Sequence, residues 1–403
     1  MIIACLSKVS YRVPLLIASG LLLPHLAGAQ LVERDLLKMI GTETWSKAEL
    51  KSLEKGDAVV RALETNSKQE LSTIGIVRIK DLPPVSMQTF RQSLDQKGND
   101  TRKAGGRFSE PAMPDDLLDL ELDDDAIRQL SKCSVGRCDL NLSAAMIRRF
   151  EAEVDWNSPE ANARATQLMK EMLLAYVNGY RLRGDAALGV YDNRRKVIDL
   201  TASHRTLLAS SSLISGLAPE FVEYLQLYPG GKLDNLEESV HWSVLDFGLK
   251  PSITLSHTSA YTRTRPEGDQ LFRASKQIYA SRYLDCSLTF TLLVRARTEN
   301  GTDTFLILID RSRSDALEGV LGKLARRMVR KESISRITEL LEKAQSRLIA
   351  SARGPAVPST ESEDRGSVIK RILKVARHPV ALITGGIVVI TLLFLVWRRR
   401  RIR

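Results

Sequence analysis

Alternating hydrophobic and polar positions run through much of the second half of the chain. This alternation has a period of two, which is typical of strands because successive side chains point to opposite faces. Connectors with turn chemistry, among them Glu299-Asn300-Gly301, separate the runs. The pattern therefore predicts consecutive antiparallel strands at residues 238–249, 252–263, 271–283, 284–297 and 303–312.

Two further strand patterns and one helical pattern stand near the start of the chain. Residues 56–64 and 69–80 alternate or are rich in β-branched side chains, and Pro83 and Pro84 follow the second run. Residues 85–94 have helical spacing. Glycine, proline and charged residues then dominate the stretch that follows, so residues 95–122 are predicted to be a loop or linker.

Helical periodicity fills the middle of the chain and returns after the last strand. The middle pattern predicts helices at 123–132, 142–154, 158–183, 199–211 and 218–227. In residues 315–350 the apolar positions recur every three or four residues, so one stripe of this helix is expected to face the sheet. The predicted fold class is α+β, an antiparallel sheet with a long closing C-terminal helix and a helical insertion or subdomain at 123–236.

Both ends of the chain are apolar. Residues 1–29 have the order of a cleavable secretory signal, with Lys8 and Arg12 before an apolar run and a small-residue site; an uncleaved anchor is the alternative. The run from Val380 to Trp397 carries no charge, and with Pro379 it would span about 28 Å as a helix, the thickness of a hydrocarbon core. The basic residues that follow it are Arg398, Arg399, Arg400 and Arg401. The sequence thus predicts one C-terminal transmembrane helix that contacts membrane lipids and a cytoplasmic basic tail.

These ends predict a single-pass protein of the cell membrane whose middle part lies outside the cytoplasm, in the periplasm of a Gram-negative cell. A processed sorting tail is the alternative to a permanent anchor. The predicted divisions are a signal peptide (1–29), the first strands and helix (30–94), a loop (95–122), the helical insertion (123–236), the sheet and closing helix (237–350), a disordered stalk (351–369), a juxtamembrane and transmembrane segment (370–397) and a tail (398–403).

Net charge gives no support for nucleic-acid binding once the ends are set aside. The chain has 59 basic and 48 acidic residues, but Lys8, Arg12 and nine basic residues after position 369 account for the whole excess. Residues 30–369 therefore carry no net charge, so the basic pI reflects the predicted anchor and not a nucleic-acid surface.

Three cysteines remain after the predicted signal. Cys133 and Cys138 are close enough to close a small disulfide loop in an oxidising compartment; two free thiols or half of a metal site are the alternatives. Cys286 alternates with apolar neighbours and is expected to be a buried, inert thiol. No second pair of ligands with zinc spacing exists, so no metal or cofactor is predicted.

The order of these elements resembles the helix-grip arrangement of START-type lipid-transfer and polyketide-cyclase-like proteins. The resemblance is carried by residues 74–80 with Pro83, Pro84 and Phe90, and by residues 305–309 with the closing helix at 315–328. It covers residues 57–94 and 237–350, and the long stretch 95–236 departs from it. The resemblance implies a cavity between sheet and closing helix and a hydrophobic ligand, but it transfers no functional residue.

Candidate catalytic residues are few. His241 and His257 fall on neighbouring predicted strands and, with Asp246, are the best candidates for acid–base or metal chemistry, although ordinary strand-face histidines are the favoured interpretation. The acidic stretch from Asp115 to Asp125 is a candidate for calcium binding, but it lacks the spacing of a calcium loop, so a solvated helix start is the favoured interpretation. No motif of a serine hydrolase, a nucleotide-binding loop or a zinc protease is present.

The sequence therefore predicts a protein of unknown activity that binds a lipid-like or other apolar ligand beside the membrane. The alternative is a structural or adaptor protein of the cell envelope whose helical block docks a protein partner. A hydrolase or cyclase that uses His241 or His257 is the least favoured hypothesis.

Overall fold

The computed structural model describes residues 30–40, 45–94, 102–194, 196–246, 250–318 and 322–353. The chain divides into residues 1–30 and 31–403, and every helix and strand named below belongs to the second unit. The predicted signal peptide, most of the predicted stalk and the predicted transmembrane segment lie outside the described residues.

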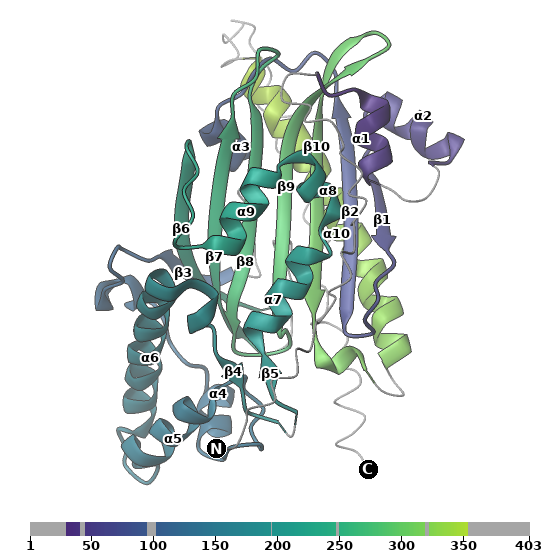
Figure 1. Ribbon diagram of the computed structural model, residues 1–403. Coiled ribbons are helices and arrows are strands. Elements are labelled where there is room, and N and C mark those ends of the chain that lie inside the picture. The colour runs from purple at the N-terminus through teal and green to yellow at the C-terminus, as the bar shows by residue number, and fades with distance from the viewer. Residues whose placement is uncertain are drawn as a thin grey trace, which may run out of the picture. The chain divides into compact units, whose positions relative to one another are not determined.

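Eight strands of the described residues form one antiparallel sheet, in the order β1-β2-β10-β9-β8-β7-β6-β3 (Figure 1). The last five strands follow one another in the chain and pair with their neighbours. Strand β2 pairs with β10, so the two ends of the folded chain meet in the sheet. The bounds are β1 (Val59–Leu63), β2 (Glu70–Ile79), β3 (Arg102–Arg107), β6 (Leu236–Leu245), β7 (Ser252–Arg263), β8 (Gln270–Ala280), β9 (Cys286–Thr298) and β10 (Gly301–Arg313).

One face of the sheet is covered by the closing helix α10 (Gly322–Ala352) and by α3 (Met87–Leu94). Because side chains alternate along a strand, Leu306 and Leu308 of β10 pack under α10. Gly75 of β2 allows the helix to come close, since a Cβ atom there would lie 2.6 Å from Leu341 Cδ1. The apolar stripe predicted for the closing helix therefore faces the sheet.

The opposite face of the sheet is covered by several helices. Phe305, Ile307 and Ile309 point to this side and share a core with them. Figure 1 shows the teal helices lying across the front of the strands. The helices that share this core are α1 (Glu33–Ile40), α7 (Leu200–Ala209), α8 (Ser212–Leu217) and α9 (Pro219–Leu227). Helix α2 (Lys47–Lys55) adds Leu53 to the core.

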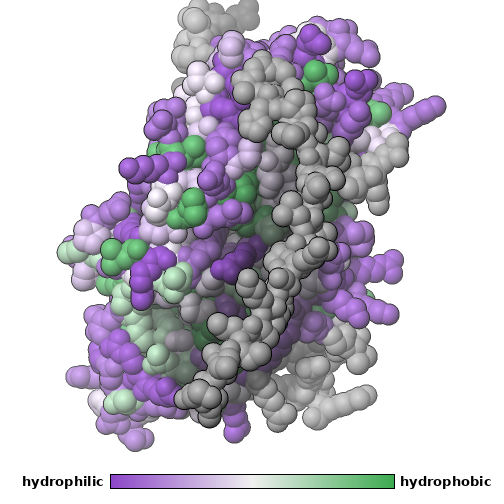
Figure 2. Space-filling view, viewed as in Figure 1, coloured by the Kyte–Doolittle hydropathy of each residue, from purple (hydrophilic) through white to green (hydrophobic). Residues whose placement is uncertain are grey.

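A helical block joins this face near β6 and the edge strand β3. Its core combines buried residues of the block with Val240, Trp242 and Leu255 of the sheet. The block contains η1 (Pro114–Leu117), α4 (Asp124–Leu130), α5 (Ala144–Glu153), α6 (Ala161–Arg183), η2 (Gly184–Ala187) and the short hairpin β4 (Val190–Tyr191) and β5 (Ile198–Asp199). Figure 2 shows that apolar side chains reach the surface of the viewed face only in scattered groups.

Two sequence predictions need correction. Residues 102–107 were expected in a loop, yet they form the edge strand β3 beside β6. Its glycines fit the close approach to Trp242, because a Cβ on Gly106 would lie 2.8 Å from the indole Nε1. Short glycine-rich edge strands lack the apolar alternation by which strands are recognised.

The second correction concerns the fold class, which included one transmembrane helix. The described residues form an α+β fold with an antiparallel sheet and a C-terminal helix, as predicted, but none of their helices is both long and apolar enough to cross a membrane. Helix α10 has the length, yet charged side chains such as Arg327 and Lys331 cover its outer side, because only one stripe packs on the sheet. Val380, Trp397 and Arg398 to Arg401 lie outside the described residues.

Candidate functional site

His241 and His257 do not form a joint site. Their strands β6 and β7 pair as expected, but His257 lies opposite Val240 and His241 lies opposite Ser256. Cross-strand partners share a face and sequence neighbours alternate, so the two imidazoles point to opposite faces. Asp246 pairs with Lys103 at a distance of 3.7 Å. Because His241 and His257 are one residue out of register with each other, they lie on different faces of the sheet.

His241 lies on the face that α10 and α3 cover. Its Nε2 is 2.9 Å from Ser239 Oγ. Burial, together with the nearby Arg273 and Arg107, lowers the pKa of His241 to about 4. The imidazole is therefore neutral near pH 7, and it stands among cations instead of beside a carboxylate that would make it a general base.

His257 lies between a phenol and a carboxylate. Its Nδ1 is 2.9 Å from the Tyr180 hydroxyl of α6, and its Nε2 is 3.1 Å from Glu238 Oε1 of β6. Burial raises the pKa of Tyr180 well above its usual value, so the phenol keeps its proton and donates it to Nδ1. The Nε2 nitrogen then carries the ring proton and faces the carboxylate.

Glu238 is held in its charged form although it is partly buried. Burial would raise its pKa, but the contacts with His257, Tyr224 and Ser259 outweigh burial and lower it. Ser259 donates its hydroxyl to Glu238 over 3.1 Å. Burial raises the pKa of Tyr228 to about 12, and the negative charge of Glu238 adds to this effect.

Four of the side chains just described, Tyr180, Tyr228, His257 and Ser259, border a cavity of about 350 Å³ between the helices and the sheet. Strands β7, β8 and β9 form its floor, and helices α6, α7 and α9 form its walls. The apolar lining comes from Leu208, Ala209, Leu225, Ala274 and Leu288. The cavity lies on the face away from α10, whereas the family resemblance implied a cavity under the closing helix. On the α10 side, Ile337 and Leu341 pack directly onto the sheet.

A lysine and an aspartate form an ion pair in the lining. Lys276 of β8 binds Asp185 of η2, and its ammonium lies 5.7 Å from the centre of the Tyr180 ring. Burial lowers the pKa of Lys276, and Asp185 opposes part of that effect. The two opposite charges cancel, so the ion pair makes the cavity lining polar but gives it little net charge.

His204 of α7 also lines the cavity and is only 3% exposed. Its Nε2 is 2.9 Å from the main-chain oxygen of Gln277. Its Nδ1 is buried and has no hydrogen-bond partner among the described residues. Burial, followed by the charge of Lys276, lowers the pKa of His204 well below its usual value.

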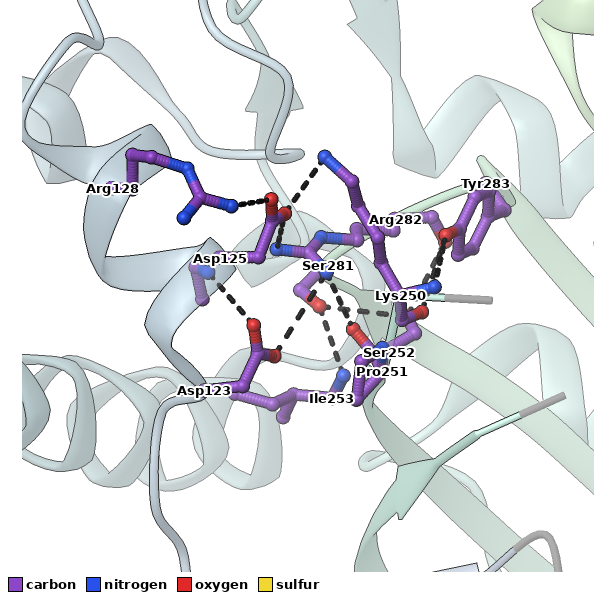
Figure 3. A network of polar contacts seen from close by, with 11 residues as sticks. Asp123, Asp125, Arg128, Lys250, Pro251, Ser252, Ile253, Ser281, Arg282 and Tyr283 are labelled. Carbon is purple, nitrogen blue, oxygen red and sulfur yellow. Dashed lines mark hydrogen bonds and ion pairs between the residues drawn. The ribbon is translucent and has the colours of Figure 1, made fainter. Parts of the chain in front are cut away.

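The acidic stretch after residue 114 is used for structure. Asp123 caps α4 by accepting from the main-chain nitrogen of Ala126. Asp125 contacts Arg128 at 2.5 Å, Lys250 at 2.8 Å and Arg282 at 3.3 Å (Figure 3). No group of three or more metal-binding side chains occurs in the part of the chain that the structure describes. This network fastens the helical block to the turns at the ends of β7 and β8.

The described residues contain one disulfide and one free cysteine. Cys133 and Cys138 are joined by a disulfide in the loop after α4. Cys286 is free and completely buried in β9. Burial raises the pKa of its thiol, which keeps it in the unreactive protonated form.

The residues around His257 were not singled out in the sequence. Tyr180 and Asp185 lie close together in the chain, but Glu238 and Lys276 come from two other segments, so no single motif unites the four residues. One local signal existed: Lys276 has the strand parity of the buried Phe272 and Ala274. A charged residue at an inward strand position indicates either a buried ion pair or a site.

Comparison of the chain with models of known protein families and with curated proteins found no match.

Proposed function

We propose that the protein is a non-enzymatic binding protein whose cavity holds a small molecule with an apolar body. The observation that carries this proposal is the cavity of about 350 Å³, whose lining combines the apolar Leu208, Leu225 and Leu288 with several polar groups. A cavity of 300–1,000 Å³ with an apolar lining and a few placed polar groups is typical of small-molecule sites.

The topology supports the proposal in part. The order of β2, the meander β6–β10 and the closing helix α10 agrees with the helix-grip resemblance. The insertion between β3 and β6 then supplies α6, α7 and α9, which enclose the cavity on the other face of the sheet. The hydrophobic ligand that the resemblance implied would therefore lie between the sheet and the insertion.

Binding is favoured over hydrolysis by the partners of the polar groups. Ser259, which lines the cavity, donates to Glu238. A hydrolase needs its nucleophile hydrogen-bonded to the base, and here His257 bonds to Tyr180, whose raised pKa makes it a poor nucleophile. The adaptor hypothesis stays a prediction.

We also propose that the described domain works outside the cytoplasm. The disulfide between Cys133 and Cys138 supports this location, since disulfides persist in oxidising compartments.

The proposal is tested by organic extraction of the purified full chain, followed by mass spectrometry. We expect one apolar molecule in a ratio near one per chain. Ala209→Trp should remove it, because Ala209 is exposed on α7 and lines the cavity. Ala202→Trp is the matched control, since Ala202 is exposed on the same helix but does not line the cavity. A clean extract from the unmodified chain would overturn the proposal.

A further inference from the structure

We infer that the first turns of α10 lie on the surface of a membrane that contains anionic lipids. The contact surface, the α10 face, consists of Lys323, Leu324, Arg327, Met328 and Lys331. The cavity of the proposed function lies on the other side of the sheet, so this inference goes beyond that function and can fail without it.

The five residues of the α10 face are exposed and share one side of the helix. With about 3.6 residues per turn, their positions fall within an arc of about 140°. The three cations recur every four residues, and Leu324, 53% exposed, and Met328, 37% exposed, stand one turn apart beside them. Ala325 and Val329 pack into the core on the opposite side of the helix, so the α10 face points to solvent.

The arrangement of charge along α10 changes after Lys331. From its start to Lys331 the helix carries five basic residues and no acidic one. In the following turns basic residues pair with acids four positions earlier, Arg336 with Glu332 and Lys343 with Glu339. Such pairs are typical of a solvated helix face. Cations in the first turns instead oppose the helix dipole, so the stability of the helix does not explain them.

Two of the five cations are used within the fold. Arg326 donates to the main-chain oxygens of Ser67 and Glu70 at the start of β2. Arg330 contacts the carboxylate of Glu64 at 3.3 Å. The three cations of the α10 face, by contrast, have no ion pair or side-chain hydrogen bond with any residue that the structure describes. Their charge is therefore open to a partner.

The acidic residues just before α10 do not neutralise this charge. They lie in and after η3 (Asp315–Leu317), whose Leu317 shares a core with α10. Asp315 contacts Arg194 at 2.5 Å, and Glu318 contacts Lys196 at 3.4 Å. Because each of these acids already has a cation as its partner, the α10 face keeps a net positive charge, which an anionic surface complements.

The exposed apolar side chains favour a lipid surface over other anionic partners. A helix that presents Lys and Arg beside exposed Leu is typical of interfacial helices, whose apolar side chains enter the boundary between headgroups and acyl chains. Leu324 and Met328 have the positions for this role. Each basic side chain near an anionic membrane strengthens the association about fivefold, so three cations contribute about a hundredfold. The competing occupant is an acidic protein, which has no acyl region for these side chains to enter.

The test is the membrane depth of a fluorophore at position 328. In a Cys5→Ser background, Met328→Cys introduces a thiol for a maleimide fluorophore, since Cys286 is buried and Cys133 is joined to Cys138. The full chain is purified in mild detergent and reconstituted with phosphatidylcholine vesicles, with or without an equal amount of phosphatidylglycerol. A lipid with a spin label in its upper acyl chain quenches any fluorophore that reaches that depth.

Ser346→Cys is the matched control for position. Ser346 is exposed and lies on the same side of α10 as Met328, about five turns or 27 Å further along. We expect quenching at position 328 in vesicles that contain phosphatidylglycerol and little quenching at position 346. Phosphatidylcholine alone should give none. Salt at about 1 M should reverse the quenching, because it shortens the Debye length to about 3 Å.

The requirement for charge is tested by replacing the three cations of the α10 face. The variant is Lys323→Gln with Arg327→Gln and Lys331→Gln, and its affinity for the anionic surface should fall about a hundredfold, with loss of quenching at position 328. The matched control removes three exposed lysines of α2 with the same four-residue spacing: Lys47→Gln, Lys51→Gln and Lys55→Gln. This control should quench like the unmodified chain.

Absence of quenching at position 328 in the anionic vesicles, which is the result that an acidic protein as the true partner would give, would overturn the inference. Equal quenching at positions 328 and 346 would also overturn it, because the chain would then meet the membrane without using the α10 face. Quenching that survives the loss of the three cations would do the same. None of these outcomes bears on the cavity, which is tested by extraction of its ligand.

Discussion

The Tyr180 hydroxyl donates to Nδ1 of His257 over 2.9 Å, across a separation of 77 residues in the chain. The bond joins the helical insertion to the sheet, since Tyr180 belongs to α6 and His257 to β7. It also fixes the tautomer of His257, which turns the ring proton toward Glu238. One contact thus links the attachment of the insertion to the polar wall of the cavity.

Loss of this bond should weaken the fold measurably. Tyr180→Phe leaves a buried imidazole acceptor without its donor, so we expect the free energy of unfolding to fall by about 1–3 kcal/mol. Urea denaturation of the full chain measures this change. Tyr228→Phe is the matched control, because no hydrogen bond of the Tyr228 hydroxyl occurs among the described residues. Equal losses in both variants would contradict the role of the Tyr180 bond.

Arg282 should matter far more to stability than Arg128, although both contact Asp125. The Arg282 side chain is 4% exposed and also donates to the main-chain oxygen of Pro251, whereas Arg128 is 58% exposed. Arg282→Met should lower the free energy of unfolding by about 2 kcal/mol. The loss is limited to this amount because Asp125 keeps Lys250 as a partner. Arg128→Met should cost less than about 0.5 kcal/mol.

Thermal or urea unfolding of the two arginine variants tests this order. Figure 3 shows both guanidinium groups directed at the same carboxylate, so the comparison measures what burial and the additional bond to Pro251 contribute. A larger effect of Arg128→Met would show that the network is a surface feature and does not fasten the insertion to the sheet.

The pH dependence of stability should carry a contribution from Asp310. This residue is buried beneath α10, and burial raises its pKa to about 6, opposed by the hydrogen bond from Thr289. Its pKa is higher in the folded than in the unfolded state, so its contribution is fully present below about pH 4. The contribution is lost as pH rises toward 6.

Asp310→Asn removes this titration, because the amide stays neutral and can accept from Thr289. The stability of the variant relative to the unmodified chain should therefore improve by about 3 kcal/mol between pH 4 and pH 7. Urea unfolding at both pH values measures the difference. A relative stability that does not change with pH would show that Asp310 is not perturbed by burial.

The cysteines predict a pattern of chemical labelling. In protein recovered from its own cells and unfolded without reductant, an alkylating reagent should modify Cys286 and spare Cys133 and Cys138. In the native protein Cys286 should also be spared, since its thiol is buried. Alkylation of Cys133 and Cys138 without reductant would contradict both the disulfide and the proposed extracytoplasmic location.

Removal of the disulfide should have a modest effect. Its loop is short, so Cys133→Ser with Cys138→Ser should reduce the free energy of unfolding by about 2 kcal/mol. Urea unfolding with and without reductant provides the internal comparison, because reduction of the unmodified chain should reproduce the loss. A loss in reductant far larger than the loss in the double variant would indicate another reducible bond.

The sequence by itself determined the elements of the sheet and its closing helix. Strands such as β7 and β9 and the stripe of α10 were predictable because apolar residues repeat with the period of each element, and burial enforces that repeat. The described residues have the predicted antiparallel sheet and C-terminal helix, but no helix among them could cross a membrane. Strand β3 was missed because an edge strand of glycine and charge carries no such repeat.

Only the tertiary structure decided where the chemistry lies. His241 and His257 were read as neighbours from their strands, but the pairing register places them on opposite faces, and register depends on contacts between distant segments. Tyr180, His257 and Lys276 meet around the cavity because the insertion folds back onto the sheet, and no local pattern records that packing. The sequence therefore determined which segments are buried, while packing decided which polar groups are buried together.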